Sequence, residues 1–231
     1  MLAVTNSIEA VDLKKRYGSG PESTFALRGV DLEVHQGEYV SISGPSGSGK
    51  STLLNMIGAL DRPTSGRVVL DGTDISKLSS AELARVRNWK VGFVFQDFNL
   101  ISRMTTVENV ELPLSIRGVP PLERREKAMS LLSGFGVADK ARRSPRDLSG
   151  GQRQRVAVAR ALAGDPSIIL ADEPTGNLDS ENARLTMEFL ERLSTEFGKT
   201  LVIVTHDPDA AARAERTFMI RDGMVERVLV N

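Results

Sequence analysis

The sequence contains no cysteine, only two histidines and no excess of either charge. Without cysteine the chain cannot form disulfides or cysteine-ligated zinc sites, and two histidines are too few for a histidine-cluster metal site. Lys plus Arg and Asp plus Glu are equal at 30 each, so net charge gives no general attraction to nucleic acid or an anionic membrane. What remains is the composition of an ordinary soluble protein, 231 residues long and able to bury a core.

Long apolar runs are also missing. No stretch approaches the ~20 residues that span a bilayer. The start of the chain, MLAVTNSIEAVDLKKRYG, contains acidic residues and lacks the sustained apolar segment of a signal peptide. We therefore expect a cytoplasmic chain, and any role at a membrane must come through a partner.

The spacing of apolar residues predicts an α/β protein. The segments IEAVDL, FALRGVDLEV, EYVSI and GRVVLDG predict partly antiparallel strands with glycine-rich turns such as YGSGPES between them. Residues 50–60 have a helical period that places Leu53, Leu54, Ile57 and Leu60 on one face. Helical patterns dominate a predicted insertion from about 97 to 163, where Thr105 and Glu108 form a capping-box pattern. SIILADE and TLVIVTH then predict buried parallel strands, with an amphipathic helix between them that stops at Gly198.

The segment GPSGSGKST fits the pattern Gly-x4-Gly-Lys-[Ser/Thr], with Gly44, Gly49, Lys50 and Ser51 at the fixed positions. The glycines let backbone N–H groups turn towards phosphate oxygens, Lys50 reaches the β- and γ-phosphates, and Ser51 can bind Mg²⁺. A predicted strand precedes the segment and a predicted helix follows it. This context favours a phosphate-binding loop over a glycine- and serine-rich turn without a ligand.

Polar side chains end three of the predicted apolar strands. Asp172 and Glu173 end SIILADE, where Asp172 is suited to hold Mg²⁺ and Glu173 to polarise a water that attacks the γ-phosphate. His206 ends TLVIVTH and Gln96 ends VGFVFQ. In the functional interpretation, His206 contacts the γ-phosphate and Gln96 contacts magnesium or the attacking water. The alternatives are a structural role for His206 and an ordinary surface position for Gln96. Tyr17 either stacks on a base or only packs.

Residues 148–162, LSGGQRQRVAVARAL, place a Ser-Gly-Gly turn at the start of a helix. Such a turn presents backbone N–H groups and the positive end of the helix to an anion. An ordinary serine-capped helix is the alternative. The chain therefore carries two candidate anion-binding loops about a hundred residues apart.

In chain order, GPSGSGKST, Gln96, LSGGQ, ILADEP, NLD and His206 resemble the ATPase subunit of an ATP-binding cassette (ABC) system. The resemblance covers residues 17 to about 223. It implies a P-loop NTPase fold in a single domain, 1–231, with a RecA-like mixed sheet, an N-terminal antiparallel β-subdomain and the helical subdomain at about 97–163. It also implies an active ATPase that uses ATP and Mg²⁺, because no catalytic position is missing.

The resemblance implies a role for each motif. Tyr17 is then the adenine-stacking aromatic and Asp179 lies in the loop that crosses a dimer interface. Glu173 is the catalytic glutamate and His206 the switch histidine. The Walker A loop comprises Gly44, Pro45, Ser46, Gly47, Ser48, Gly49, Lys50, Ser51 and Thr52. The signature loop comprises Ser149, Gly150, Gly151 and Gln152. The implied magnesium contacts are Ser51, the lid glutamine Gln96 and the Walker B aspartate Asp172.

Two longer segments of the sequence indicate a branch of this family. QDFNLISRMTTVENVELPL and DEPTGNLDS resemble the ATPases of lipoprotein-release and macrolide-export systems, whose membrane partner has few spans and a large outer domain. The resemblance implies a homodimer that sandwiches two ATP molecules and lies on the inner face of the membrane through a permease, docked near residues 96–107. The alternatives are a cell-division complex that transmits force without transport and a soluble ABC ATPase acting on DNA or ribosomes. We expect no nucleic acid partner, and the LSGGQ helix disfavours a P-loop kinase or GTPase.

Overall fold

The computed structural model describes residues 5–20 and 23–231. The first four residues, and Pro21 and Glu22 of the predicted turn YGSGPES, lie outside the described residues. The chain divides into two compact units: Met1–Arg87 with Leu190–Asn231, and Asn88–Phe189. In the described part of the chain, no helix is both long and apolar enough to cross a membrane.

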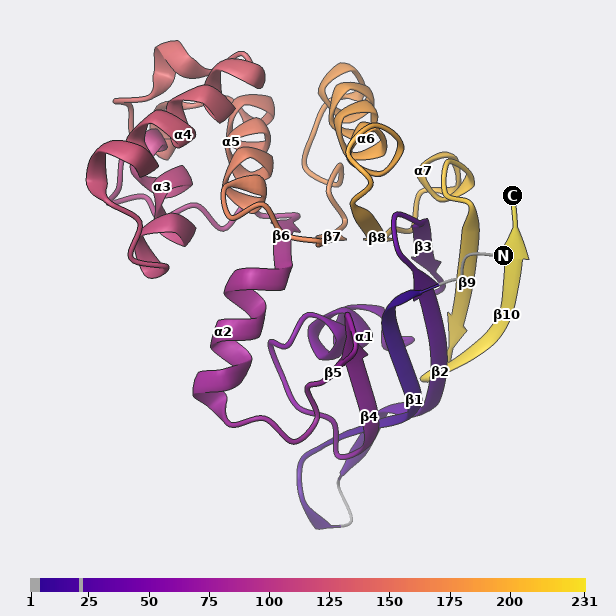
Figure 1. Ribbon diagram of the computed structural model, residues 1–231. Coiled ribbons are helices and arrows are strands. Elements are labelled where there is room, and N and C mark those ends of the chain that lie inside the picture. The colour runs from indigo at the N-terminus through magenta and orange to yellow at the C-terminus, as the bar shows by residue number, and fades with distance from the viewer. Residues whose placement is uncertain (1–4, 21–22) are drawn as a thin grey trace. The chain divides into compact units, whose positions relative to one another are not determined.

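An antiparallel sheet forms one part of the first unit. Its strands are β1 (Asn6–Tyr17), β2 (Thr24–His35), β4 (Ser65–Leu70) and β5 (Thr73–Asp74), in the order β2-β1-β4-β5. β1 pairs antiparallel with both β2 and β4, as Figure 1 shows. Buried and exposed residues alternate over most of β2, which is typical of a strand with one face on the core. The antiparallel N-terminal strands predicted from the sequence are confirmed.

A second set of strands in the first unit is mostly parallel. It comprises β3 (Tyr39–Ser43), β8 (Thr200–Val204), β9 (Arg216–Arg221) and β10 (Met224–Val230), in the order β10-β9-β3-β8. β3 runs parallel to β8 and β9, whereas β10 returns antiparallel to β9. Every residue of β8 is buried, as its continuous apolar run predicts. The β9–β10 hairpin was missed, although its Asp222-Gly223 turn is a strong hairpin signal.

Two helices of the first unit begin just beyond the ends of strands. α1 (Lys50–Ile57) follows β3 and α7 (Pro208–Ala212) follows β8. α1 buries Leu53, Leu54, Met56 and Ile57. Leu60 was expected on the same buried face, but the helix ends at Ile57 and Leu60 is 43% exposed. The helical period cannot extend past Gly58, which is the C-cap.

The second unit combines two parallel strands with a group of helices. β6 (Val91–Phe95) pairs with β7 (Ile168–Asp172). The helices α3 (Thr106–Ile116), α4 (Pro121–Gly134) and α5 (Gly150–Leu162) pack against one another (Figure 1). Two 3-10 turns, η2 (Ala138–Lys140) and η3 (Pro145–Asp147), connect α4 to α5. The capping box at Thr105 and Glu108 is confirmed.

Two further helices, α2 (Ser80–Lys90) and α6 (Ser180–Thr195), contribute residues to both units. α2 was not predicted, because only Leu83 is buried along it. The expectation of a single domain, with a helical subdomain at about 97–163, stays a prediction.

The only tryptophan, Trp89, lies near the end of α2 and is 60% exposed. The guanidinium of Arg117 lies 4.4 Å from the centre of its ring. Arg117 also donates to Gly164 O at 2.5 Å and to Asn88 O, and its burial lowers its pKa. Two backbone carbonyls therefore hold the guanidinium that faces this ring.

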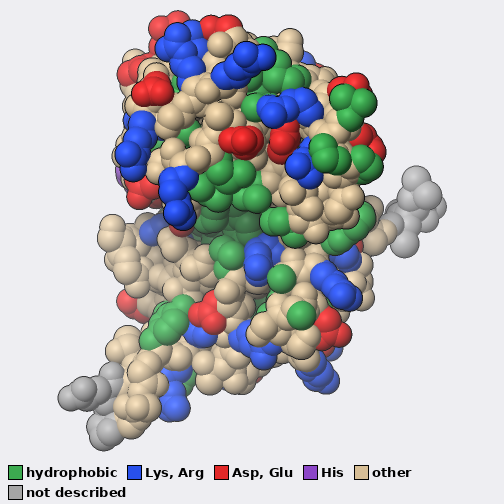
Figure 2. All heavy atoms as spheres, turned by 90° about the vertical axis from the view of Figure 1, so that its left-hand side faces the viewer, with side chains coloured by type: hydrophobic (Ala, Val, Ile, Leu, Met, Phe, Trp, Pro, Cys, Tyr) green, Lys and Arg blue, Asp and Glu red, His purple; other side chains and the backbone are tan. Residues whose placement is uncertain are grey.

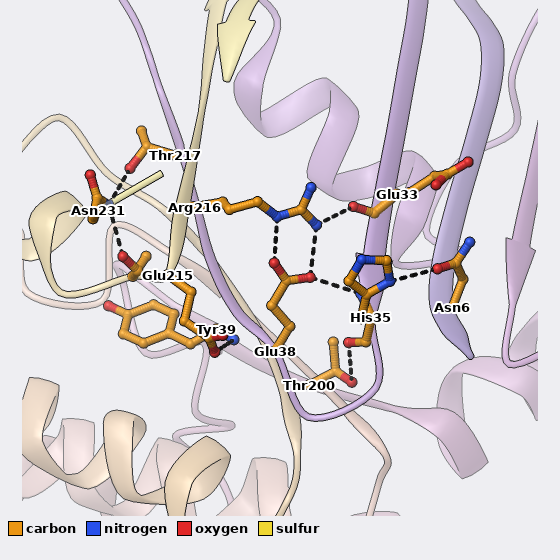
Figure 3. Close-up of polar contacts among 11 residues, drawn as sticks. Asn6, Glu33, His35, Glu38, Tyr39, Thr200, Glu215, Arg216, Thr217 and Asn231 are labelled. Atoms are coloured by element: carbon orange, nitrogen blue, oxygen red, sulfur yellow. Dashed lines mark hydrogen bonds and ion pairs between the residues drawn. The ribbon is translucent and has the colours of Figure 1, made fainter. Parts of the chain in front are cut away.

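An ion pair holds the start of β3 (Figure 3). Arg216 donates to both carboxylate oxygens of Glu38, at 2.5 and 2.8 Å, and also to Glu33 O at 2.8 Å. The backbone N–H of His35 adds a further bond to Glu38 at 2.8 Å. Burial alone would raise the pKa of Glu38, but these hydrogen bonds and the Arg216 charge hold it below its ordinary value.

Candidate functional site

The first loop, residues 44–52, connects β3 to α1 and depends on its glycines. Gly44 and Gly49 have φ of +148° and +105°, where L-residues are strained. A Cβ at Gly44 would lie 2.0 Å from Ile220 O, and one at Gly49 would lie 2.5 Å from Ala26 O. The backbone of the same unit therefore leaves no room for a side chain at Gly44 or Gly49.

The polar groups of the first loop fit a phosphate. Lys50 Nζ donates to Gly44 O and Pro45 O, each at 2.9 Å, so its ammonium group lies over the loop. The hydroxyl of Ser48 is buried and has no hydrogen-bond partner among the described residues. A cation, an unsatisfied hydroxyl and the N-terminus of α1 together form a site that an anion would complete.

Tyr17 is the last residue of β1 and its side chain is 45% exposed. Its hydroxyl donates to Asp61 at 3.2 Å, and the Lys15 ammonium lies 5.0 Å from the ring centre. Lys15 also pairs with Asp61 at 2.7 Å. The ring is therefore oriented by this pair while remaining accessible for stacking.

His206 lies two residues beyond β8 rather than at its last position. Thr205 N donates to Ile42 O at 3.1 Å, which ties this segment to β3. Asp207 caps α7 by accepting from Asp209 N at 2.9 Å. His206 is exposed between these two anchored residues, in the same unit as the first loop.

In the second unit, Asp172 and Gln96 lie at the same edge of the β6–β7 pair. Asp172 ends β7 and pairs in register with Phe95, the last residue of β6, so Gln96 follows directly. Glu173 adopts φ of 45°, a left-handed conformation that non-glycine residues rarely adopt. The carboxyl ends of parallel strands are where ligands bind in α/β sheets, and the predicted proximity of these side chains fits that edge.

Asn177, which was not predicted as a site residue, holds this edge together. Its side-chain amide donates to Gln96 O at 3.1 Å and to Asp97 Oδ1 at 2.9 Å. A Cβ at Gly176 would lie 2.8 Å from Gln96 Nε2. Asn177 belongs to the segment DEPTGNLD, whose Gly-Asn pair was the available sequence signal for this role.

The second loop, residues 149–152, opens α5 with a capping box. Ser149 Oγ accepts from Gln152 N at 3.3 Å, and Gln152 Oε1 accepts from Ser149 N at 3.0 Å. A Cβ at Gly150 would make only ordinary contacts, the nearest 3.6 Å from Asn177 O. A Cβ at Gly151 would lie 2.0 Å from the side-chain oxygen of Asn182. The two glycines therefore have different reasons to lack a side chain.

Asp179 caps the start of α6. Its carboxylate accepts from Asn182 N at 2.9 Å and Asn182 Nδ2 at 2.8 Å, and these bonds lower its pKa. Because Asp179 fixes the Asn182 side chain, it also sets the position of the group that faces Gly151. The loop with Asp179 and the second loop are thus linked within the second unit.

A groove in the second unit lies beside Gln96. It has a volume of about 410 Å³. Its lining includes Asp97, Phe98, Leu100, Arg146, Arg153 and Asn177. Residues 96–107 were predicted to dock a partner, but the two arginines of the groove, Arg146 in η3 and Arg153 in α5, were not predicted there.

Among the described residues, no group of three or more His, Asp or Glu side chains could hold a metal ion. The predicted magnesium contacts, Ser51, Gln96 and Asp172, include only one carboxylate. Mg²⁺ commonly binds through one or two carboxylates, with waters and substrate phosphates completing its shell. This donor set fits a magnesium ion that arrives with a phosphate.

Comparison with known proteins identifies the family. The ABC transporter family matches residues 27–176. An uncharacterized ABC transporter ATP-binding protein of Thermotoga maritima is 52% identical over 221 residues, covering 96% of this chain and 94% of the relative. The macrolide export ATP-binding/permease protein MacB of Syntrophobacter fumaroxidans is 48% identical over 221 residues, covering 95% of this chain but only 31% of its own length.

The structural comparison agrees. The dimeric structure of a post-hydrolysis state of the ATP-binding cassette MJ0796 bound to ADP and Pi, a Methanocaldococcus jannaschii protein, has a TM-score of 0.91 and 47% identity, covering 96% of this chain and 98% of that chain. The predicted P-loop NTPase fold is confirmed. The family match, the relatives that align over nearly their full length and the shared fold show together that this chain belongs to the ABC transporter family and is an ATP-binding ATPase of that family.

Proposed function

We propose that this chain is the nucleotide-binding subunit of a lipoprotein-release or macrolide-export type system, and that two copies close around two ATP molecules to drive a membrane permease. The observation that carries this proposal is the contrast inside the second loop. Gly151 lacks a side chain because Asn182 occupies the space, whereas Gly150 has room for one in its own chain. A ligand held by a second copy supplies the missing reason for glycine at position 150.

In this proposal the first loop holds the phosphates of one ATP and Tyr17 stacks on its adenine. Lys50 and the Ser48 hydroxyl supply a charge and a donor that lack an anionic partner among the contacts of the loop. Ser51, Gln96 and Asp172 hold the Mg²⁺ ion that neutralises phosphate charge. Each copy gives its second loop to the ATP of the other, so a two-fold pair completes both sites.

Hydrolysis is assigned to Glu173 and His206. The Glu173 carboxylate polarises the attacking water, and His206 contacts the γ-phosphate. Asp179 belongs to the loop that crosses between the copies. Because ATP binds both copies while its products bind them less well, hydrolysis shifts the pair from closed to open.

The membrane partner is inferred from the relatives. Several similar proteins are named macrolide export ATP-binding/permease proteins, so their names place both functions in one chain. The 410 Å³ groove beside Gln96 supports a docking position for such a permease, on the inner face of the membrane. A cell-division complex that transmits force would use the same groove and remains the alternative within the family.

A DNA- or ribosome-directed role has less support. On the face in Figure 2, Lys and Arg side chains are interspersed with Asp, Glu and hydrophobic side chains and do not form one basic field. Zero net charge agrees with this pattern. Binding driven by phosphate contacts requires clustered basic side chains.

Replacement of Glu173 by Gln tests the shared site. We expect ATP binding to persist, hydrolysis to fall by about a thousandfold, and light scattering to detect a dimer only with Mg·ATP. The wild-type chain with the same nucleotide is the matched control. A variant that binds Mg·ATP at saturation and stays monomeric would contradict the proposal for the free chain.

A tagged pull-down from gently solubilised membranes tests the branch. Stoichiometric recovery of a few-span protein with a large outer domain supports the proposal. Recovery of a many-span permease would overturn the branch, and recovery with nucleic acid or ribosomes in the soluble fraction would overturn the membrane role.

A further inference from the structure

Two successive residues after Gln96 have an unusual backbone. Phe98 and Asn99 have φ of 62° and 48°, in the left-handed region that a bulky aromatic residue rarely enters. Asn99 N donates to Asp97 O at 2.6 Å, which closes a three-residue turn around Phe98. A turn of this type is strained and persists only where its surroundings hold it.

Arg160 on α5 holds this turn from one side. Its Nη1 donates to Asn99 O at 2.5 Å and its Nη2 to Phe98 O at 2.9 Å. Burial lowers the pKa of Arg160 to about 10. One planar guanidinium therefore satisfies the two carbonyls that the left-handed turn exposes, a geometry that matches its fixed fork of donors.

Arg153 holds the ring of Phe98 from the same helix. Arg153 lies seven residues before Arg160, which is two turns along one helical face. Its guanidinium carbon lies 5.1 Å from the Phe98 ring centre. Two arginines of α5 thus contact Phe98, Arg153 at its ring and Arg160 at its carbonyl. Both Phe98 and Arg153 line the groove.

Gln96 is the residue whose position depends on this turn. Asn177 binds Gln96 O and Asp97 Oδ1, so the segment is fixed just before Phe98 as well. β6 fixes the backbone before Gln96, and the turn fixes the backbone after it. The direction of the Gln96 side chain is therefore set between two anchored points.

We propose that Arg160 is a positioning residue for ATP hydrolysis. Its two hydrogen bonds to the Phe98–Asn99 turn, called the latch below, hold this turn in place and thereby set where Gln96 points. The effect on hydrolysis rests on the proposed role of Gln96 at Mg²⁺, whereas the latch itself does not. α5 also begins with the second loop, so one helix positions both Gln96 and the loop offered to the other copy.

Arg160→Lys tests the latch in the full chain without nucleotide. One ammonium cannot reproduce two diverging guanidinium bonds. We expect the amides of residues 97–99 to exchange with solvent about tenfold faster by hydrogen-exchange mass spectrometry, while α3 and α4 stay unchanged. Arg184→Lys is the matched control, because Arg184 pairs with Glu188 on the surface. Unchanged exchange in the turn, or a uniform increase throughout the unit, would overturn the latch.

Steady-state kinetics test the consequence. We expect Arg160→Lys to lower kcat about tenfold with KM for Mg·ATP within about twofold, because the first loop is untouched. A raised KM with normal kcat would overturn the positioning role. Faster exchange with normal kcat would retain the latch and refute only its link to hydrolysis.

Two changes at Asn99 separate strain from packing, because this side chain is exposed. Asn99→Gly in the Arg160→Lys background relaxes the left-handed residue and should restore at least about a third of the lost kcat. Asn99→Val, with Arg160 intact, should reproduce the faster exchange and lower kcat, because β-branched residues disfavour positive φ. It also provides the test if Arg160→Lys fails to fold. No rescue by glycine together with no effect of valine would refute the proposal.

Discussion

In the first loop, Gly44 and Gly49 are closed in by backbone atoms. In the second loop, only Gly151 is closed in, and there by a side chain. Gly44 and Gly49 face carbonyl oxygens of the same unit, which cannot turn away. Gly151 faces the end of Asn182, and Gly150 faces only ordinary contacts. This contrast is what the proposed dimer requires, because a loop that serves the nucleotide of a second copy must leave one side open.

The largest effect is expected from Gly44→Ala. The new methyl group would lie 2.0 Å from Ile220 O at φ of +148°. Overpacking and backbone strain together cost roughly 3 kcal/mol of folding free energy and distort the loop. Thermal unfolding and a fluorescent ATP analogue measure the two losses. Gly47→Ala is the control, since no atom lies within 4 Å there and only φ of +77° is unfavourable. Equal losses at both positions would show that the backbone wall is unimportant.

Gly151→Ala comes next. Its methyl group would lie 2.0 Å from Asn182 Oδ1, a side-chain atom that can move. We expect a loss of about 1–2 kcal/mol in the free energy of unfolding, measured by urea titration. Asn182→Ala should remove most of this penalty in the double variant. If the penalties of the two single changes simply add, Gly151 is not limited by Asn182.

Glu38→Gln should have a smaller, pH-dependent effect at the other end of the strand that carries the first loop. The pKa of Glu38 is held below its ordinary value of 4.5, so the Arg216 pair stabilises the fold above that pH and loses this contribution as pH falls. We expect a loss of about 1 kcal/mol at neutral pH, because Arg216 is partly exposed. The difference in melting temperature between variant and wild type should shrink as pH falls below 4.5; a constant difference would contradict this.

Gly150→Ala should change stability least. The added methyl group makes contacts no closer than 3.6 Å, and alanine suits a helix better than glycine. We expect unchanged melting and unchanged ATP binding, but ATPase activity lowered about tenfold if the loop meets the nucleotide of another copy. Normal activity would indicate a loop that serves only as a helix cap.

The site was predictable where chemistry follows strand ends, and unpredictable where it depends on tertiary contacts. Asp172 and Gln96 were predicted at strand ends because both follow apolar runs, and the β6–β7 register brings these two ends to one edge. The left-handed turn at Phe98 has no signal in the sequence, because a phenylalanine there is an exception to backbone preference. Arg160 looks like any helical arginine until its carbonyl partners are known.

Fold elements divide in the same way. Strands with continuous apolar runs, such as β7 and β8, were identified correctly because every residue but the last of β7 is buried. α2 escaped because it buries a single leucine, although Ser79 and Glu82 form a reciprocal cap at its start. Exposed helices depend on capping and charge rather than on periodicity, so their apolar pattern is weak.

The lone tryptophan gives the protein a built-in optical reporter. All indole emission comes from Trp89, whose ring lies beside the Arg117 guanidinium in the unit that lacks the first loop. Any change in its intensity or wavelength during turnover therefore registers a change in the surroundings of Trp89 itself, without an added label.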